Sequence, residues 1–351
     1  MSPTVSGADL DDLVVGVSLL GSGGGGDART LAHVLRRELG AGEQRLHRPE
    51  ELANRTVLPV AVVGATSLFL EKLPGGRELT GAVLAVGRWT GVRPTAVMPL
   101  EAGGLNGVTR LLAALALDLP LLDVDLMGRA LPRLDQLSWS AQGMPLVPCA
   151  LCESGGQVLI IDGASPGDLE RTARSFLVQS GGWAAIALRP VPVAEAAANG
   201  IIGSLAHALE LGRAHATLSE GSSAAAVERA LGGVVLGSGR VRQIARPHEP
   251  DPTKSSIHVE DSDTGAVLRI EAQHEYLLAF VDGHPVASTP DLLCVLDRRT
   301  YAPISVDRLR AGDEVMVLSC PGPSWWRQHG QLRHVGPEAF GFDLEPVLAE
   351  R

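Results

Sequence analysis

The chain has 351 residues, of which 45% are hydrophobic and 20% charged, and its formal net charge is -10. This length exceeds what one hydrophobic core usually supports, so we expect a globular protein of two domains. The negative charge argues against nucleic acid as a partner, because phosphates are bound by clustered Lys and Arg.

No membrane segment or secretory leader is visible. The first residues lack a basic stretch followed by an apolar one. The longest apolar run, residues 111–122, is too short to span a bilayer and contains Asp118 and Pro120. We therefore expect a cytoplasmic protein that does not contact membranes.

The first two predicted elements are helices separated by glycines. Residues 6–21 and 27–39 both carry Leu and Val at helical spacing, and Asp27 is well placed to cap the second helix. Four consecutive glycines, from Gly23 to Gly26, stand between them. Because a helix and not a strand precedes these glycines, the P-loop and the dinucleotide-binding fingerprint are excluded.

The glycine run Gly23, Gly24, Gly25 and Gly26 has three candidate uses: a flexible linker, a close packing contact, or a cradle of N–H groups. Its apolar flanking sequences disfavour a linker, which is normally polar. Free N–H groups and the helix dipole both attract negative charge at a helix start. We favour a cradle for an anion or a polarised carbonyl, with close helix packing as the alternative.

Strands and helices alternate from residue 56. We expect strands at 56–65, 95–101 and 120–126, helices at 78–91 and 106–119, and a strand pair within 144–151 and 156–162. Strand–helix–strand units of this kind form right-handed crossovers. The sequence therefore predicts an α/β domain with a largely parallel sheet.

The second half has a different pattern. A helix at 165–177 marks the expected boundary, a second helix covers 203–218, residues 231–300 are strand-like with turn signals, and residues 321–345 are expected to form an ordered loop. We expect an N-terminal α/β domain at 1–166 and a C-terminal β-rich domain with a helical insertion at 167–351.

Acidic residues follow several predicted strands. Glu101 ends one strand and precedes Asn106 at a helix start, Asp123 and Asp125 are expected to share one face of the next strand, and Glu71 follows the first. Ligands bind at the carboxyl edge of such sheets, and crowded carboxylates raise one another's pKa, which suits general acid and base chemistry. The alternative is that these residues are helix caps and turn formers.

Three further residues are candidates for the site. Arg129 could pair with Asp125 or bind a substrate carboxylate. His274, at the turn into a predicted strand, is the most suggestive histidine, and Asp291 after Pro290 is either a turn residue or a site carboxylate.

Metal and thiol chemistry have weaker support. A divalent metal ion such as zinc could activate water, with Asp123, Asp125 and His274 as candidate ligands, but their spacing matches no metal motif. Cys149 and Cys152 have CxxC spacing, yet no second close pair exists, and we interpret them as buried thiols.

The chain resembles the S-methyl thiohydantoin desulfurase family. The stretches that carry the resemblance are LGSGGGGDA, EKLPGG, MPLEAGGLNG, DVDLMGRALP, ALELGRA, PDLLCVLD and GPEAFGFDLEPV, which keep their order from about residue 8 to 346. The chain departs from the family's usual residues at Leu126, Arg133 and His274.

The resemblance implies two domains and hydrolysis of an S-methylated five-membered thiohydantoin to a hydantoin, with release of methanethiol. The positions that match the family's motifs are Gly23 to Gly26, Asp27, Glu71, Glu101, Asn106, Asp123, Asp125, Arg129 and Asp291. In this reading a carboxylate such as Asp123 or Glu101 activates water while the glycine amides bind a ring carbonyl.

We expect the partners to be a small cyclic substrate and further copies of the chain in a homo-oligomer. Two other functions stay open. One is an amidohydrolase or carboxylase component that acts on a hydantoin or lactam. The other is a non-catalytic subunit that binds a small anion at the glycine run.

Overall fold

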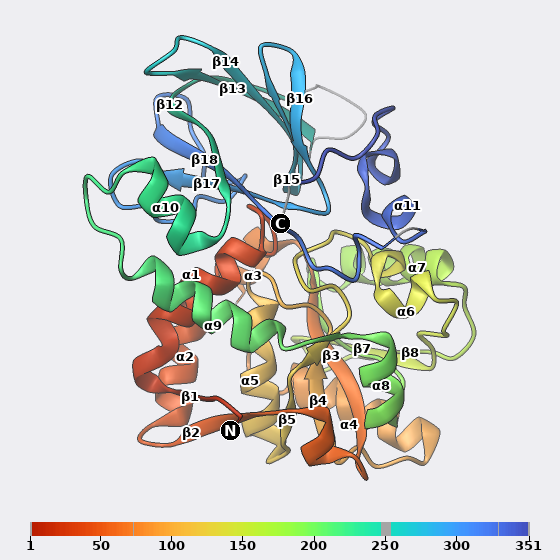
Figure 1. The fold of residues 1–351 in the computed structure, drawn as a ribbon. Helices are drawn as coiled ribbons and strands as arrows, with labels where there is room; N and C mark the ends of the chain where they lie inside the picture. The colour runs from red at the N-terminus through yellow and green to blue at the C-terminus, as the bar shows by residue number, and fades with distance from the viewer. Residues whose placement is uncertain (1, 73, 247–253, 329, 350–351) are drawn as a thin grey trace.

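The computed structural model describes residues 2–72, 74–246, 254–328 and 330–349, and each half of the molecule is built on one sheet (Figure 1). From one edge to the other, the first sheet contains β1 (Thr4–Ser6), β2 (Glu43–His47), β5 (Leu121–Leu122), β4 (Ala96–Pro99), β3 (Thr56–Gly64), β9 (Trp183–Ala187), β7 (Cys149–Glu153) and β8 (Val158–Ile161). A short strand, β10 (Val191–Pro192), also pairs with β3. The neighbours β2, β5, β4 and β3 run parallel, and the other pairs are antiparallel.

Helices cover both faces of this sheet. Because successive strand residues point to opposite faces, Leu58 and Val60 of β3 join one core while Val57 and Ala61 join another. The helices of the first core include α1 (Leu10–Leu20), α2 (Arg29–Leu39), α4 (Glu78–Thr90) and α5 (Asn106–Leu117). Those of the second include α6 (Ser138–Ala141), α7 (Pro166–Gln179) and α8 (Val193–Asn199).

The remaining short elements connect these layers. They are α3 (Thr66–Glu71), α9 (Ser204–His215) packed along α1, α10 (Ala224–Leu231), α11 (Leu332–Val335), the paired strands β6 (Val124–Asp125) and β11 (Ile201–Ile202), and single 3-10 turns at Gly7–Asp9, Pro49–Leu52, Leu134–Gln136 and Pro337–Phe340. Within the described ranges, no helix combines the length and the apolar character needed to cross a membrane.

The second sheet is antiparallel and lies above the first in Figure 1. Its strand order is β16 (His284–Ser288), β15 (Glu275–Val281), β14 (Val267–Gln273), β13 (Lys254–Asp261), β12 (Val234–Ala245), β18 (Glu314–Cys320) and β17 (Leu292–Asp297). Strands β15 and β17 also contact each other, so the sheet curls on itself around its own apolar core. The start of β15 reaches the first sheet's domain, since the Tyr276 amide donates to the Ser22 carbonyl at 2.8 Å.

The predicted α/β fold with parallel strands and a β-rich C-terminal part is confirmed. Two features differ in detail. Strands β9 and β10 follow residue 166 yet belong to the first sheet, so that sheet takes strands from both sides of the expected boundary. The predicted loop 321–345 contains α11 and a 3-10 turn.

The predicted strand 120–126 is not continuous. Strand β5 ends at Leu122, and the next two residues of the ladder, Val124 and Asp125, pair with β11 instead. The chain turns at Asp123, whose carboxylate binds the first amides of α9. Contacts with residues distant in sequence therefore interrupt a strand that local hydrophobic periodicity predicts to be continuous.

Candidate functional site

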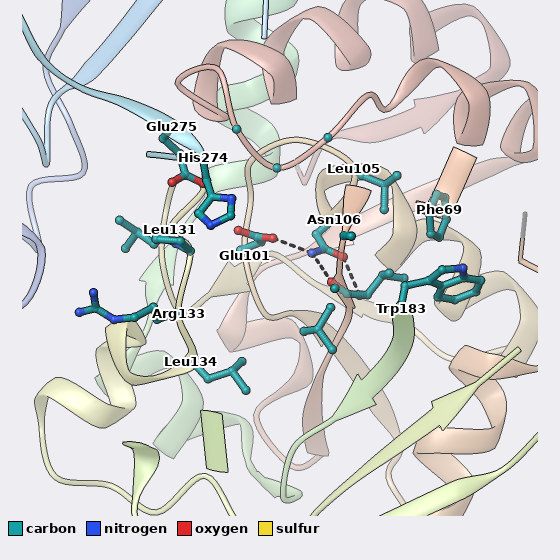
Figure 2. A pocket seen from close by; sticks show the side chains of 18 of the residues that line it. Phe69, Glu101, Leu105, Asn106, Leu131, Arg133, Leu134, Trp183, His274 and Glu275 are labelled. Atoms are coloured by element: carbon teal, nitrogen blue, oxygen red, sulfur yellow. Dashed lines mark hydrogen bonds between the residues drawn. The ribbon is translucent and has the colours of Figure 1, made fainter. Parts of the chain in front are cut away.

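A cavity of about 500 Å³ lies where the two sheets meet. The first sheet's domain contributes the glycine run, the segments that follow β3 and β4, and one face of α7. The second sheet's domain contributes the turn into β15 and, from the loop between β17 and β18, Val306 and Asp307. In Figure 2, His274 and Glu275 lie on one side, Phe69 and Trp183 on the other, and Glu101 between them.

The glycine run lies at this junction and is hydrogen-bonded to both domains. The Gly23 carbonyl accepts from the amide of Val306 at 2.9 Å, and the Gly25 carbonyl accepts from the amide of Leu105 at 2.8 Å. The run 23–26 is thus fixed to both domains through its carbonyl oxygens. Its conformation is set by packing and is not that of a free linker.

Three amides of the run remain free to bind a ligand. Gly23, Gly25 and Gly26 have φ angles of 83°, 72° and 78°, a left-handed conformation that favours glycine. Within the described part of the chain, the N–H groups of these three residues donate to no protein acceptor. Since all four glycines line the cavity, the run is a suitable cradle for a carbonyl or anionic oxygen.

Side chains would not fit at two of these positions. A Cβ at Gly24 would lie 2.4 Å from Oε1 of Glu275, and one at Gly23 would lie 2.3 Å from the Tyr276 ring. The glycines therefore allow the first two residues of β15 to approach the backbone closely. This contact brings the Glu275 carboxyl to the cavity.

Glu101 and Asn106 form a buried pair on the cavity wall. Strand β4 stops before β3 does, and the Asn106 amide continues the ladder: its Oδ1 accepts from the Val62 N–H at 2.7 Å and its Nδ2 donates to the Val62 carbonyl at 2.8 Å. The same Nδ2 donates to Oε1 of Glu101 at 2.6 Å (Figure 2). Glu101 is thereby held in one orientation.

The electrostatic environment favours the neutral form of Glu101. Burial raises the pKa of Glu101 to about 7, and the nearby Asp125 adds to the shift, although the Asn106 hydrogen bond opposes it. At neutral pH, this carboxyl exchanges a proton readily. That is the property required of a general base that later returns the proton.

Glu275 is a second buried carboxyl on the same cavity, and the sequence did not single it out. Only 3% of the residue is exposed, and its Oε2 has no hydrogen-bond partner among the described residues. Burial raises the pKa of Glu275 to about 8; the Arg129 charge lowers it and the Glu101 charge raises it further. Its neighbour His274, which has a positive φ of 66°, also lines the cavity.

Asp123 and Asp125 do not line this cavity, so the expectation that they face the same cleft as the glycine run is wrong. Asp123 accepts from the amides of Leu205 and Ala206 at 2.9 and 3.0 Å and caps α9. Asp125 is fully buried and accepts from the amide of Met127 at 2.8 Å. Their carboxylates therefore stabilise the backbone, which was the alternative interpretation of acids at strand ends.

A buried arginine compensates these acids. Arg110, on α5, is fully buried, and its Nη1 donates to the Glu101 carbonyl at 3.4 Å. Burial lowers its pKa to about 10, while the charges of Asp123, Asp125 and Glu101 oppose that shift. Arg110 therefore offsets the negative charge behind the cavity without lining it.

Arg129 and Asp291 also lie outside the cavity lining. Arg129 is fully buried, and its Nη1 donates to the carbonyls of Pro290 and Asp291 at 2.9 and 2.8 Å. The Asp291 carboxylate accepts from the amides of Gly322 and Ala349 at 2.8 and 2.7 Å. These residues join the two domains and the C-terminal segment.

Asp27 and Glu71 are likewise not part of the cavity lining. Asp27 accepts from the backbone amide of Arg29 at 3.0 Å and forms an ion pair with Arg308 at 2.6 Å. Burial opposes ionisation of Asp27, but the hydrogen bonds from Arg29 and then the Arg308 charge lower its pKa overall. Glu71 is exposed at the end of α3. The structure thus brings together Gly23 to Gly26, Glu101, Asn106 and His274, and leaves the other predicted site residues apart.

The candidate metal ligands do not meet. Asp123 and Asp125 are engaged away from His274, and among the described residues no cluster of three or more His, Cys, Asp or Glu side chains could hold a metal ion. Cys149 and Cys152 are unpaired and buried, as predicted for structural thiols. Burial raises the pKa of Cys149 to about 12, which makes it a poor nucleophile.

Comparison with known proteins identifies the family. Residues 8–163 match the model of the S-Me-THD-like, N-terminal domain, and residues 164–348 match that of the S-Me-THD-like, C-terminal domain. A crystal structure of a protein from Chromobacterium violaceum has a similar fold, with a TM-score of 0.82 at 24% identity over 99% of this chain and 100% of its own. No curated protein matches. The chain belongs to the S-Me-THD-like family.

Proposed function

We propose that this protein hydrolyses the C–S bond of an S-methylated thiohydantoin or a closely related five-membered ring, giving a hydantoin and a thiol. The observation that carries the proposal is the position of Glu101. Its buried carboxyl, oriented by Asn106, lies on the same cavity as the unbonded amides of the glycine run. Membership of the S-Me-THD-like family supports this choice of ring.

Binding of the ring carbonyl is assigned to the glycine amides. Preorganised donors stabilise an oxygen that gains negative charge, and removal of one such donor costs about 3 kcal/mol in known enzymes. A carbonyl bound at Gly25 and Gly26 polarises the ring. This polarisation makes the carbon that bears sulfur more electrophilic.

We assign to Glu101 the role of general base for the attack of water. As the water oxygen bonds to the C–S carbon, the Glu101 carboxylate takes one of its protons, and the electron pair of the C=N bond moves to the ring nitrogen. Glu101 then passes that proton to the nitrogen. The result is a tetrahedral carbon that carries a hydroxyl and the S-methyl group.

We assign to Glu275 the protonation of the leaving thiolate. A thiolate is a basic leaving group, and Glu275, with its pKa raised to about 8, is protonated at neutral pH. As the hydroxyl loses its proton to Glu101 and becomes a carbonyl, the C–S bond breaks and sulfur takes the Glu275 proton. Transfer of a proton from Glu101 back to Glu275 restores the starting state.

The test is an assay of the purified protein on a panel of S-methyl thiohydantoins and hydantoins. The proposal expects methanethiol and hydantoin in equal amounts. A ureido acid formed by ring opening would instead identify an amidohydrolase. Binding of hydantoin without turnover of any ring in the panel would identify a non-catalytic binding protein, and either result contradicts the proposal.

A further inference from the structure

The cavity extends beyond the groups assigned to the ring. Five apolar side chains are among its lining residues, and we call them together the apolar subsite: Phe69, Leu134, Ala173, Leu177 and Trp183. Phe69 and Trp183 lie on the opposite side of Glu101 from Glu275 in Figure 2. They come from α3 and β9, while Ala173 and Leu177 come from α7 and Leu134 from the 3-10 turn Leu134–Gln136.

The aromatic wall of the subsite offers no free polar atom. The rings of Phe69 and Trp183 pack edge to face, with centroids 4.9 Å apart and planes at 61°. The indole nitrogen of Trp183 donates to the Lys72 carbonyl at 2.9 Å. Because the only polar group of the indole is already bonded, the wall presents only apolar surface to a ligand.

The α7 wall carries charge that is neutralised internally. Glu170, Ala173, Arg174 and Leu177 recur at helical spacing and all line the cavity. One Glu170 oxygen accepts from Arg174 Nε at 2.6 Å, and the other accepts from the Leu134 amide at 2.8 Å. The wall therefore has no net charge, and its apolar members are left to contact a ligand.

The volume of the cavity exceeds the needs of the ring. A cavity of about 500 Å³ falls within the range that encloses drug-sized molecules, and an S-methylated thiohydantoin ring alone is much smaller. We infer that the natural substrate carries a bulky apolar substituent on the ring, aryl or branched alkyl, and that the apolar subsite binds it. This inference rests on the proposed function.

Two arginines that line the cavity favour a different class of substrate, one with an anionic substituent. Arg133, on the other side of Glu101 from Trp183 in Figure 2, and Arg246, at the end of β12, could attract an anionic substituent. The Arg133 side chain is already bonded to Asp135 at 2.9 Å. A substrate with a carboxylate-bearing substituent is therefore the discriminating comparison.

The experiment compares S-methyl thiohydantoins with methyl, isobutyl, benzyl and carboxyethyl groups at the same ring carbon. Full burial of a Phe-sized side chain is worth about 1.5–3 kcal/mol, or roughly 10- to 150-fold. We expect kcat/KM for the benzyl substrate to exceed that for the methyl substrate at least about tenfold. Equal values, or a preference for the carboxyethyl substrate, would overturn the inference.

Two matched variants of α7 localise the effect. Ala173→Leu fills the subsite and should lower the benzyl-to-methyl ratio of kcat/KM at least about tenfold. Thr172→Leu places the same leucine side chain at an exposed position of the same helix and should leave the ratio unchanged. A ratio that survives Ala173→Leu would contradict the assignment.

Binding of the matching hydantoins by calorimetry separates this inference from the proposed reaction. If no substrate releases thiol but benzylhydantoin binds about tenfold more tightly than methylhydantoin, the reaction is wrong and the subsite is supported. If thiol is released at equal rates from every substrate and the hydantoins bind equally, the reaction stands and the subsite is wrong. Absence of both turnover and binding would overturn both.

Discussion

Replacement of Asn106 by leucine removes the side chain that holds Glu101 against the end of β3. Leucine has nearly the same shape, but it leaves the Val62 N–H and carbonyl without their partners and removes the donor to Glu101 Oε1. Each buried polar group left unpaired costs about 1–3 kcal/mol. Because Val62 is only partly buried, we expect a loss of about 2–4 kcal/mol in the free energy of unfolding.

The same change should raise the pKa of Glu101 above its value of about 7, because the Asn106 hydrogen bond favours the ionised form. A hydrogen bond to a charged group is worth about 1.5–3 kcal/mol, and one pKa unit corresponds to about 1.4 kcal/mol. The acid limb of the kcat/KM profile for thiol release should therefore move upward by about one to two pH units. Because a Glu101 with a pKa of about 7 is half ionised at pH 7, this shift predicts a rate at neutral pH that is lower by roughly 5- to 50-fold.

The assay combines denaturant unfolding with the pH profile of thiol release. The matched control is Asn199→Leu, which removes a 2.9 Å hydrogen bond to the Glu195 carbonyl at the end of α8, outside the cavity lining. The control should lose stability and keep the wild-type pH profile. An Asn106→Leu protein with an unshifted acid limb would refute the role assigned to this side chain.

Three further predictions follow from the contacts of the site. Gly24→Ala places a Cβ 2.4 Å from the Glu275 carboxyl, so it should displace that side chain and lower kcat for thiol release at least about tenfold; a wild-type kcat would contradict the close contact. Asp123→Asn weakens the cap of α9 and should cost about 0.5–2 kcal/mol in the free energy of unfolding while kcat/KM is retained; loss of kcat/KM at constant stability would restore Asp123 to the site. Glu101 and Glu275 have pKa values raised from 4.5 to about 7 and about 8, so between pH 4.5 and 8 the folded state keeps protons that the unfolded state has lost, and the free energy of unfolding should fall as pH rises through this range. Urea titrations at pH 5 and 8.5 should show a smaller fall in Glu275→Gln; an equal fall would mean that Glu275 does not titrate there.

The parts of the site that local sequence could predict lie next to elements with clear periodicity. The glycine run was expected at the start of α2 because two helical patterns flank it. Glu101 and Asn106 were expected at a sheet edge because a strand ends just before one and a helix begins at the other. Parallel strands align their carboxyl ends, so these residues converge whatever the remaining contacts are.

Asp123 and Asp125 were misplaced because their partners are distant in sequence. A period of two places both acids on one face only if the strand continues, and here the chain leaves the sheet at Asp123 to meet α9 and β11. Those contacts join residues about 80 positions apart, which hydrophobic periodicity does not report.

Glu275 was missed for a related reason. Histidine is a common catalytic residue type, so the sequence favours its neighbour His274. The burial of Glu275 depends instead on contact with Gly24, which is far away in the chain. A carboxyl at the first position of an otherwise apolar strand was the available signal. The positive φ of His274 is the local feature that directs this turn, and the sequence does not specify it.

The most direct test of the central claim is thiol release by wild type and Glu101→Gln in ¹⁸O-labelled water. Wild type should give methanethiol and hydantoin in equal amounts. The label should be in the oxygen of the new carbonyl, which forms at the carbon that carried the S-methyl group. General base catalysis contributes roughly 10²- to 10⁴-fold, so Glu101→Gln should lower kcat at least about 100-fold with a KM close to wild type. A Glu101→Gln protein that retains the wild-type kcat, or a hydantoin without label, would contradict the account.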